Sequence, residues 1–392
     1  MASAEARRQR KIMRVGIDAR HFFYRQAGTY TYVRRLIDFF ANAGDGPNFT
    51  VILSVKDKAT RLPDSPRFRR HSAWTPPHNR FEQAVLPLEL AFAGLDVLHS
   101  TDFIPPFHRN FKSVISVLDL AFLLFPDTVT AETKRYYGQI YRAVDSADGI
   151  IAISESTKQD MVRLLGVSPD RVTVTHLGVD PSFRPLDSLD RQTFCMDNGL
   201  PRDFALFVGT IEPRKNLGRL VEAWSILRRE GSESLEKTKL VIAGRRGWLF
   251  EDVFKVVERE GMAAEVVFFE PKGQQDLLAL YNLARLFVFP SLYEGFGFPP
   301  LEAMACGLPV VCANTSSLPE VVGDAALLVE PTDVTALAGA IHRALTDEDL
   351  RSGMRERGLL QAANFTWQKS AEQTLAVYFE AMGAKGKRVK GE

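Results

Sequence analysis

Short β-forming runs alternate with helical segments along almost the whole chain, and this alternation constrains the fold more than any other feature. Repeated strand–helix–strand units favour a parallel sheet covered by helices. In the first half we expect strands at residues 13–18, 50–55, 96–99, 113–118, 149–154 and 172–175. Residues 31–43, between two of these strands, carry apolar side chains at helical spacing. The first half therefore predicts a doubly wound α/β domain.

The same alternation restarts after a segment that contains Pro181 and Pro185, so we place a domain boundary between residues 181 and 201. A chain of 392 residues is also too long for one typical core. Further strands are expected at 205–209, 239–243, 265–269, 286–290, 309–313 and 326–329, with helices that include 217–230, 276–284 and a last one at 367–382. The sequence thus predicts two Rossmann-like domains, residues 13–183 and 202–364. They would face a central cleft with the carboxyl ends of their strands.

Composition excludes several classes of protein. A formal net charge of +1 argues against a nucleic-acid-binding protein. Cys195, Cys306 and Cys312 form no C-x-x-C pair and have no histidine nearby, so we expect neither disulfides nor a metal site. No apolar run approaches the roughly 20 residues of a membrane span. We expect a cytoplasmic protein whose basic ends, residues 1–11 and 385–390, are either solvated or touch the inner face of an anionic membrane.

Residues 290–302 set two carboxylates, Glu294 and Glu302, around a glycine-containing turn. β-forming residues precede this loop, and a short helix at 301–306 follows it. A helix N-terminus presents backbone N–H groups and a positive dipole end, which favour a phosphate. Because like charges repel, the two glutamates would take hydroxyl groups instead. The loop predicts a site for a ligand that is both phosphorylated and polyhydroxylated, such as a nucleotide sugar.

A second polar segment lies at residues 209–216, where Gly209 ends a strand and Arg214 and Lys215 stand just before a helix that Asn216 can cap. Two cations at the carboxyl edge of a sheet would neutralise a diphosphate leaving group as it gains charge. Alone, such a pair is usually solvated surface. Together with the 290–302 loop in the same domain, it predicts a phosphate clamp.

These segments resemble the retaining glycosyltransferases of family 4. The resemblance is specific over residues 206–216, 290–309 and 317–320, and looser over 16–20, 96–100, 153–156 and 177–180. It implies a GT-B fold in which the helix at 367–382 returns to the first domain. It also implies transfer, without metal or other cofactor, from a nucleoside-diphosphate sugar of the GDP-mannose or UDP-glucose type. The anomeric configuration would be retained, and the acceptor would be a saccharide or lipid-linked saccharide in polysaccharide biosynthesis.

The resemblance also assigns roles to residues of the second domain. Glu294 would hold hydroxyls of the donor sugar, and Glu302 would hold the ribose hydroxyls. Arg214 and Lys215 would clamp the diphosphate, and the departing phosphate would act as base. Loop backbone would complete the donor site, at Gly209, Gly295, Gly297 and Phe298. The alternative for Glu302 is an ordinary acid in the first turn of a helix.

In the first domain the resemblance is less complete. Gly28 and Thr29 open a helix and would face the diphosphate or the acceptor, although Ala27 replaces a glycine that the family often has. His99 ends a strand and could touch the acceptor together with Asp119. An equally good interpretation is that His99 is structural, with its ring nitrogens hydrogen-bonded inside the protein.

Leu118 departs from the family pattern, in which histidine commonly precedes the aspartate and approaches the donor sugar near its 6-hydroxyl. A buried hydroxyl without a partner costs roughly 1–3 kcal/mol. Leu118 therefore suggests a 6-deoxy sugar or a pentose as donor. The alternative is that Asp119 or a water makes the contact and that the donor is an ordinary mannose or glucose.

Other polar segments have simpler explanations. Residues 347–349 resemble a D-x-D metal clamp but lie in a helix-rich stretch, so we interpret them as a solvated acidic face. Residues 67–71 read as a charged turn, with an anionic acceptor or lipid surface as the alternative. Two rival functions remain: a nucleotide-sugar epimerase of the same fold and a catalytically weak nucleotide-sugar-binding protein.

Overall fold

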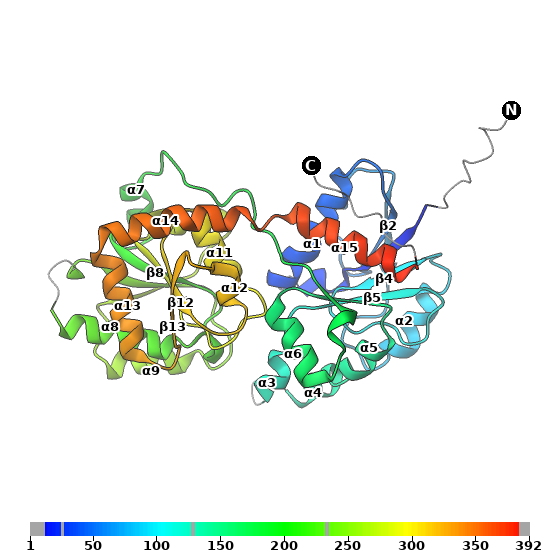
Figure 1. The fold of residues 1–392 in the computed structure, drawn as a ribbon, viewed down its shortest axis with the longest axis horizontal. Helices are drawn as coiled ribbons and strands as arrows, with labels where there is room; N and C mark the ends of the chain where they lie inside the picture. The colour runs from blue at the N-terminus through cyan, green and yellow to red at the C-terminus, as the bar shows by residue number, and fades with distance from the viewer. Residues whose placement is uncertain (1–11, 25–26, 127–129, 232–234, 384–392) are drawn as a thin grey trace. The chain divides into compact units, whose positions relative to one another are not determined.

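The computed structural model describes residues 12–24, 27–126, 130–231 and 235–383 (Figure 1). The chain divides into two compact units. Unit 1 comprises residues 1–177 and 367–392, and unit 2 comprises residues 178–366. Each unit has its own parallel sheet and its own buried core.

Unit 1 is built on a seven-stranded sheet in the order β3-β2-β1-β4-β5-β6-β7, and every neighbouring pair is parallel. Six of the strands confirm the sequence-based expectations. The strands are β1 (Arg14–Asp18), β2 (Asn48–Ser54), β3 (Phe68–Ala73), β4 (Val97–Ser100), β5 (Lys112–Val117), β6 (Gly149–Ala152) and β7 (Val172–Val174).

The helices of unit 1 connect these strands. They are η1 (Arg20–Tyr24), α1 (Ala27–Asn42), α2 (Glu82–Leu90), α3 (Ala121–Leu124), α4 (Ala131–Tyr137), α5 (Ile140–Ser146), α6 (Glu155–Leu165), η3 (Pro169–Arg171) and α15 (Trp367–Ala381). The last helix, α15, contacts α1, β5 and β6 (Figure 1). The C-terminal end of the described chain is therefore part of unit 1.

β3 corrects one interpretation. Residues 67–71 were expected to form a charged turn, but they enter an edge strand that pairs only with β2. Arg69 and Arg70 are exposed on it. Charged side chains are a common way to protect a sheet edge from further pairing, and they also hide the strand from a search for alternating apolar residues.

Unit 2 contains a six-stranded parallel sheet in the order β10-β9-β8-β11-β12-β13. All six expected strands are present. They are β8 (Phe204–Val208), β9 (Lys239–Ala243), β10 (Val266–Phe269), β11 (Leu286–Phe289), β12 (Val310–Ala313) and β13 (Ala326–Val329). They are almost continuously apolar because helices cover the sheet.

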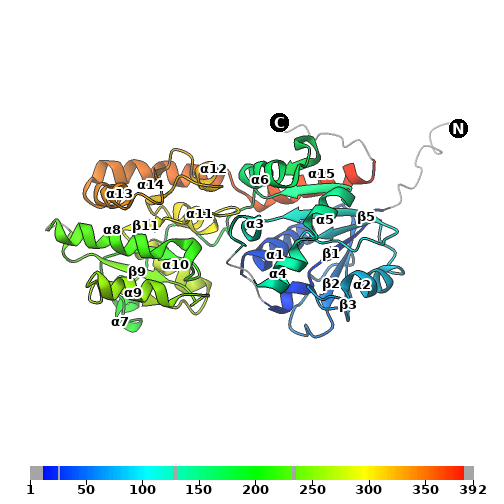
Figure 2. The ribbon, with the colours of Figure 1, turned by 90° about the horizontal axis from the view of Figure 1, so that it is seen from below.

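The helices of unit 2 are α7 (Arg191–Asp197), η4 (Pro213–Lys215), α8 (Leu217–Arg229), α9 (Glu251–Arg259), α10 (Gln274–Leu283), α11 (Phe298–Ala305), α12 (Leu318–Val322), α13 (Val334–Thr346) and α14 (Glu348–Ala363). α8 packs against both α9 and α13, and α11 packs against α14 (Figure 2). Asp347 of the acidic stretch caps α14, because its Oδ1 accepts from the Leu350 N–H at 2.9 Å.

The division between the units falls earlier than the predicted boundary at 181–201. The Val179 N–H donates to the Phe365 carbonyl at 3.0 Å, and the Leu186 N–H donates to Asn282 Oδ1 at 2.9 Å. These contacts attach the proline-containing segment to unit 2. A proline-rich break in sequence thus marks an irregular segment but not which unit it packs on.

Among the described residues, no helix is long and apolar enough to cross a membrane. The same residues contain no group of three or more His, Cys, Asp or Glu side chains arranged to hold a metal ion.

Candidate active site

The predicted donor residues of the second half gather at the carboxyl ends of β8 and β11 in unit 2. Gly209 follows β8 and lies against Gly244, which follows β9. A Cβ atom on Gly244 would lie only 1.8 Å from the Gly209 carbonyl oxygen. Beyond this point the two loops stay side by side through a bridge between Ile211 and Arg246. Glycine at 244 is therefore required for the close approach that positions η4.

η4 carries Arg214 and Lys215 and ends at Asn216, which has a left-handed backbone (φ 60°). Asn216 was expected to cap α8, but its side chain makes no capping hydrogen bond. Its Nδ2 instead donates to the carbonyls of Pro290 (3.1 Å) and Pro331 (2.7 Å). Asn216 therefore ties the cationic turn to the loop after β11, a long-range contact that local sequence does not reveal.

Glu294 forms the centre of this site. Lys215 Nζ lies 2.6 Å from its Oε1, and Arg214 Nη1 lies 3.1 Å from its Oε2. Glu294 is only 9% exposed. Burial alone would raise the pKa of its carboxyl, but the charges of Lys215 and Arg214 and the hydrogen bond from Lys215 lower it to about 2. Glu294 is therefore ionised at neutral pH.

The loop that carries Glu294 is fixed on both sides. The Leu292 N–H donates to the Arg214 carbonyl at 2.9 Å, so the loop and η4 hold each other. On the other side, Ser316 Oγ accepts from the Glu294 N–H and Ser317 Oγ donates to the Glu294 carbonyl, both at 2.9 Å. Ser316 was not among the predicted site residues. Its positive φ of 50° is a signal that appears only in the structure.

α11 begins at Phe298, three residues before the expected helix start at 301. Proline at the first helical positions explains the early start, since its missing N–H is not needed there. Gly297 precedes it with a φ of 126°, and a Cβ there would lie 3.0 Å from the Leu318 side chain. Gly295, Gly297 and Phe298 thus form the turn from β11 into α11, as expected, and their role in donor binding stays a prediction.

Glu302 is the fifth residue of α11, so it lies beyond the first turn and is not the ordinary first-turn acid of the alternative interpretation. Its Oε2 accepts from the Tyr281 hydroxyl at 2.9 Å. Burial raises the pKa of Glu302 to about 7, and the hydrogen bond from Tyr281 opposes the rise. Tyr281 belongs to α10 and was missed, because a contact between two helices leaves no local motif.

The structure places the remaining predicted residues in unit 1. Gly28 is exposed and Thr29 half-buried in the first turn of α1, and a Cβ on Gly28 would meet no atom within 4 Å. Leu118 and Asp119 directly follow β5 and are half-buried. Asp119 Oδ1 accepts from the Ala121 N–H at 2.9 Å. Leu118 and Asp119 therefore occupy the carboxyl edge of the unit 1 sheet, where ligands of such sheets bind.

His99 is completely buried (0% exposed). Its Nδ1 lies 2.7 Å from the Tyr378 hydroxyl of α15, and its Nε2 lies 2.7 Å from Ser116 Oγ. Burial lowers its pKa to about 3. Both ring nitrogens are satisfied inside unit 1, so the structure favours a structural histidine over a contact with the acceptor.

Comparisons with known proteins identify the family. A model described as "Glycosyltransferase Family 4" matches residues 27–183, and one described as "Glycosyl transferases group 1" matches residues 197–361. The O-antigen chain mannosyltransferase B of Escherichia coli is 35% identical over 72% of this chain and 74% of its own length. The chain belongs to the family 4 glycosyltransferases.

A longer relative and a solved structure show the same similarity. This glycosyltransferase is 32% identical to the serotype-specific mannosyltransferase WbdA of Escherichia coli over 75% of its length, but spans only 38% of that protein. Among solved structures, the sucrose-phosphate synthase of Thermosynechococcus elongatus matches with a TM-score of 0.76 at 20% identity, over 95% of this chain and all of that one. The two parallel-sheet units are those of the GT-B fold.

Proposed function

We propose that the glycosyltransferase moves a hexosyl group from a nucleoside-diphosphate sugar to a saccharide acceptor with retention of anomeric configuration. Mannose is the first candidate for the donor sugar, because two relatives are named mannosyltransferases. Their names also support a role in assembling a surface polysaccharide. The observation that carries the proposal is the buried Glu294 carboxylate held by Lys215 and Arg214 at the carboxyl ends of β8 and β11.

In the proposed reaction, Lys215, Arg214 and Glu294 act from the positions that they occupy in the structure. The bond between the sugar C1 and the β-phosphate oxygen breaks, and C1 forms a bond to the acceptor oxygen on the same face. The acceptor proton passes to the departing phosphate. Lys215 and Arg214 stabilise the negative charge that grows on the diphosphate, while Glu294 keeps both cations in place and accepts hydroxyl groups of the sugar ring.

Glu302 is proposed to bind the ribose. A carboxylate offers two acceptor oxygens to two neighbouring hydroxyls, and Glu302 lies on α11, the helix whose N-terminus follows the Glu294 loop. Gly209 and the turn at 295–298 would line the diphosphate. Leu118, at the carboxyl edge of the other sheet, keeps open the alternative of a 6-deoxy or pentose donor.

The decisive experiment measures nucleotide release from GDP-mannose, UDP-glucose and their 6-deoxy or pentose counterparts, each with and without mannosides as acceptors. We expect release that depends on the acceptor, and a product whose anomeric proton in NMR shows the configuration of the donor. Release of an altered sugar nucleotide without any acceptor would support an epimerase. Tight binding without turnover of any donor would support a weak binding protein.

A further inference from the structure

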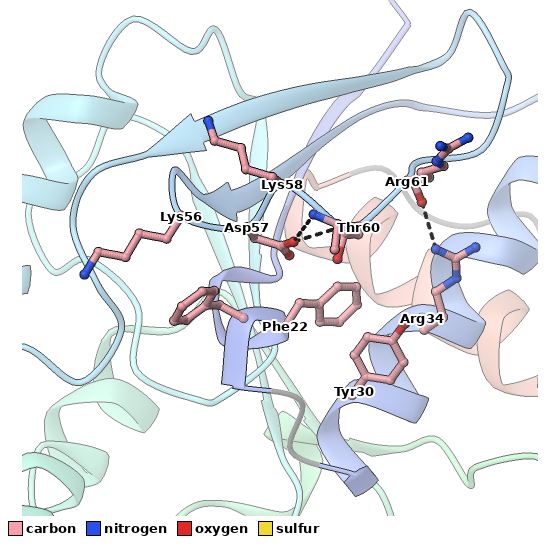
Figure 3. A pocket seen from close by; sticks show the side chains of 10 residues that line it. Phe22, Tyr30, Arg34, Lys56, Asp57, Lys58, Thr60 and Arg61 are labelled. Atoms are coloured by element: carbon pink, nitrogen blue, oxygen red, sulfur yellow. Dashed lines mark hydrogen bonds between the residues drawn. The ribbon is translucent and has the colours of Figure 1, made fainter. Parts of the chain in front are cut away.

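A pocket of about 950 Å³ opens in unit 1 beside the carboxyl ends of β1 and β2 (Figure 3). η1, the first turns of α1 and the segment 56–61 after β2 line it. None of its lining residues was predicted to have a function. Because the segment 56–61 is distant in sequence from η1 and α1 and shares no motif with them, only the folded unit brings these pieces together.

One wall of the pocket is aromatic. The buried Phe22 ring (2% exposed) supports the half-buried Tyr30 ring, with their centroids 4.6 Å apart, and Phe23, which is 45% exposed, also lines the pocket. Figure 3 shows Phe22 and Tyr30 beneath the segment 56–61. Aromatic rings with a partly open face are suited to packing against an amphipathic ligand such as a sugar ring.

The rim of the pocket is cationic. Lys56, Lys58 and Arg61 are exposed on the segment that borders the pocket, and their side chains point in different directions, away from the Phe22 and Tyr30 rings (Figure 3). No carboxylate in the described part of the chain forms an ion pair with any of the three. Arg34 lines the pocket too, but it is paired with Asp38 at 3.0 Å and braces the segment by donating to the Arg61 carbonyl at 2.9 Å.

Asp57, the acidic residue of the pocket lining, holds the segment in shape. Its Oδ1 accepts from the N–H groups of Ala59 (3.1 Å) and Thr60 (3.0 Å). Burial would raise the pKa of Asp57, but these hydrogen bonds lower it. Asp57 is therefore used inside the turn. The exposed charges of the segment are those of Lys56, Lys58 and Arg61, whose long side chains can turn toward a ligand at the opening.

We propose that this pocket binds a negatively charged saccharide, carrying a phosphate ester or a carboxylate, as part of the acceptor. This proposal rests on the proposed glycosyl transfer for its biological role. The aromatic wall would receive a sugar ring, and Lys56, Lys58 and Arg61 would receive the anionic group. Attraction by three cations is sensitive to salt, so the affinity for the anionic ligand falls as ionic strength rises.

The test uses direct binding to the full chain, so that it does not depend on catalysis. The probes are methyl mannoside, methyl mannoside 6-phosphate and methyl glucuronide, and their affinities are measured by calorimetry or NMR. We expect the two anionic probes to bind at least tenfold more tightly than the neutral one. The triple variant Lys56→Gln/Lys58→Gln/Arg61→Gln should lose that preference, and Lys134→Gln, which removes an exposed lysine of α4, should keep it.

Equal affinities for neutral and charged probes would overturn the proposal, and so would a triple variant that keeps the preference. The phosphate and glucuronide arms show which anion the pocket prefers. Nucleotide release from the donor without acceptor, measured for the same variants, reports on unit 2 separately. Loss of turnover with intact probe binding would count against the proposed transfer and not against the pocket.

A second and independent observation concerns α2, which is apolar on two faces. Leu86 and Leu90 face inward and pack with Ile52, Leu98 and Phe111. The outer face also carries large apolar side chains, at positions spaced as one side of a helix. Their exposed fractions, with that of the neighbouring Trp74, are Phe81 56%, Val85 41%, Leu88 72%, Phe92 96% and Trp74 76%.

Two arginines lie beside this outer face of α2. The Arg80 guanidinium lies 4.6 Å from the centre of the Phe81 ring, and Arg69 Nη2 donates to the Ala93 carbonyl beside Phe92. The acids of α2 are turned to other partners. Glu82 is buried in an ion pair with Arg20, and Glu89 accepts from the Thr75 N–H at 3.2 Å. The face thus combines exposed apolar side chains with positive charge.

We infer that the outer face of α2 inserts into the surface of a membrane rich in anionic phospholipid. An amphipathic surface of this kind gains from burial of its apolar side chains and from attraction to anionic headgroups. A second copy of the chain is a poorer occupant, because a two-fold contact through this face would enclose the two arginines of each copy, Arg69 and Arg80, between like charges. Trp74 is suited to the membrane interface, where tryptophan is enriched.

Co-sedimentation of the full chain with vesicles of phosphatidylcholine, with and without 30% phosphatidylglycerol, tests this inference. We expect binding to the anionic vesicles, weakened at least tenfold in Leu88→Ser/Phe92→Ser. Leu360→Ser is the matched control, since Leu360 is 67% exposed on α14 of unit 2, and it should bind as the wild type does. No binding by the wild type, binding unaffected by the double variant, or self-association that the double variant abolishes would each overturn the inference.

Discussion

The regions around Glu294 and His99 both lie close to the carboxyl edge of a parallel sheet, yet they use buried polar groups in opposite ways. Around Glu294, in unit 2, a buried carboxylate holds two cations in a charged cluster that lines the candidate donor site. Around His99, in unit 1, burial lowers the pKa of an imidazole that connects Ser116 with Tyr378 in a neutral network. The first arrangement can respond to a charged ligand, whereas the second joins α15 to the sheet.

Lys215→Ala should have the largest effect. It removes a charge from the proposed diphosphate clamp and leaves Arg214 as the remaining cation beside Glu294, so we expect kcat/KM to fall at least about a thousandfold. Stability should also fall by roughly 3 kcal/mol, because a buried carboxylate loses a partner. Steady-state kinetics and urea unfolding measure the two effects.

Lys239→Ala provides the control for Lys215→Ala. Lys239 also pairs with a glutamate, Glu265, at 2.9 Å, but at the more exposed amino end of β9. We expect a loss below about 1 kcal/mol and unchanged kinetics. If both variants lost activity equally, the charged cluster around Glu294 would have only a structural role, as the network around His99 has.

His99→Gln should change stability without changing catalysis. Its pKa of about 3 lies below the unfolded value, so the unfolded state binds a proton first as the pH falls. The contribution of His99 to stability is complete above about pH 6.5. It is lost toward pH 3 at up to about 1.4 kcal/mol per pH unit. The variant should be less stable by about 2 kcal/mol at pH 7.5, and should lack this part of the pH dependence.

Denaturant unfolding at pH 5 and pH 7.5 measures the His99 effect. Tyr378→Phe removes one partner of His99 and should lower stability while preserving the pH dependence. The alternative role for His99, contact with the acceptor, predicts instead a selective rise in KM for the acceptor. That outcome would show that His99 contacts the acceptor.

Local sequence predicted that Arg214 and Lys215, on one turn, and Glu294, on the loop after β11, belong to one region of unit 2, and the structure joins them in ion pairs. The roles of these residues and of Glu302 toward a donor stay predictions. The partners that set their properties were not predictable. Tyr281 reaches Glu302 from another helix, and Asn216 bonds to two carbonyls distant in sequence instead of capping α8.

The twelve strands expected from sequence are all present because each is a run of apolar residues that a covered sheet requires. β3 was not predicted from the sequence, because an edge strand can carry arginines at exposed positions. The pocket beside β1 and β2 was not predicted for another reason. Its aromatic and cationic residues come from separate segments, and neither segment carries a motif of its own.

Glu302→Gln should reveal a titration in the donor site. The pKa of Glu302 is about 7 because of burial, so the carboxylate proposed to bind ribose hydroxyls forms between pH 6 and pH 8. Affinity of the wild type for a nucleoside-diphosphate sugar should rise up to about tenfold over this range, since the ionised form is the better acceptor. In the variant this rise should be absent. Calorimetric titrations at several pH values provide the measurement.

Tyr281→Phe sharpens the Glu302 test, because its hydroxyl donates the hydrogen bond that opposes the rise in pKa. Without this bond the midpoint of the titration should move to higher pH. A midpoint that stays in place in Tyr281→Phe, or a pH dependence that persists in Glu302→Gln, would assign the titration to another group.

The smallest effect is expected at Leu118, the unit 1 residue that we propose influences the choice of donor sugar. A leucine offers no partner to a 6-hydroxyl, so the wild type should use GDP-D-rhamnose, the 6-deoxy form of GDP-mannose, nearly as well as GDP-mannose. Leu118→His adds a hydrogen-bonding group worth about 1 kcal/mol, which should raise the preference for GDP-mannose about fivefold. Competition between the two donors in one reaction measures this ratio directly. A strong wild-type preference for GDP-mannose that Leu118→His leaves unchanged would show that Asp119 or a water serves the 6-hydroxyl, and that the donor is an ordinary hexose.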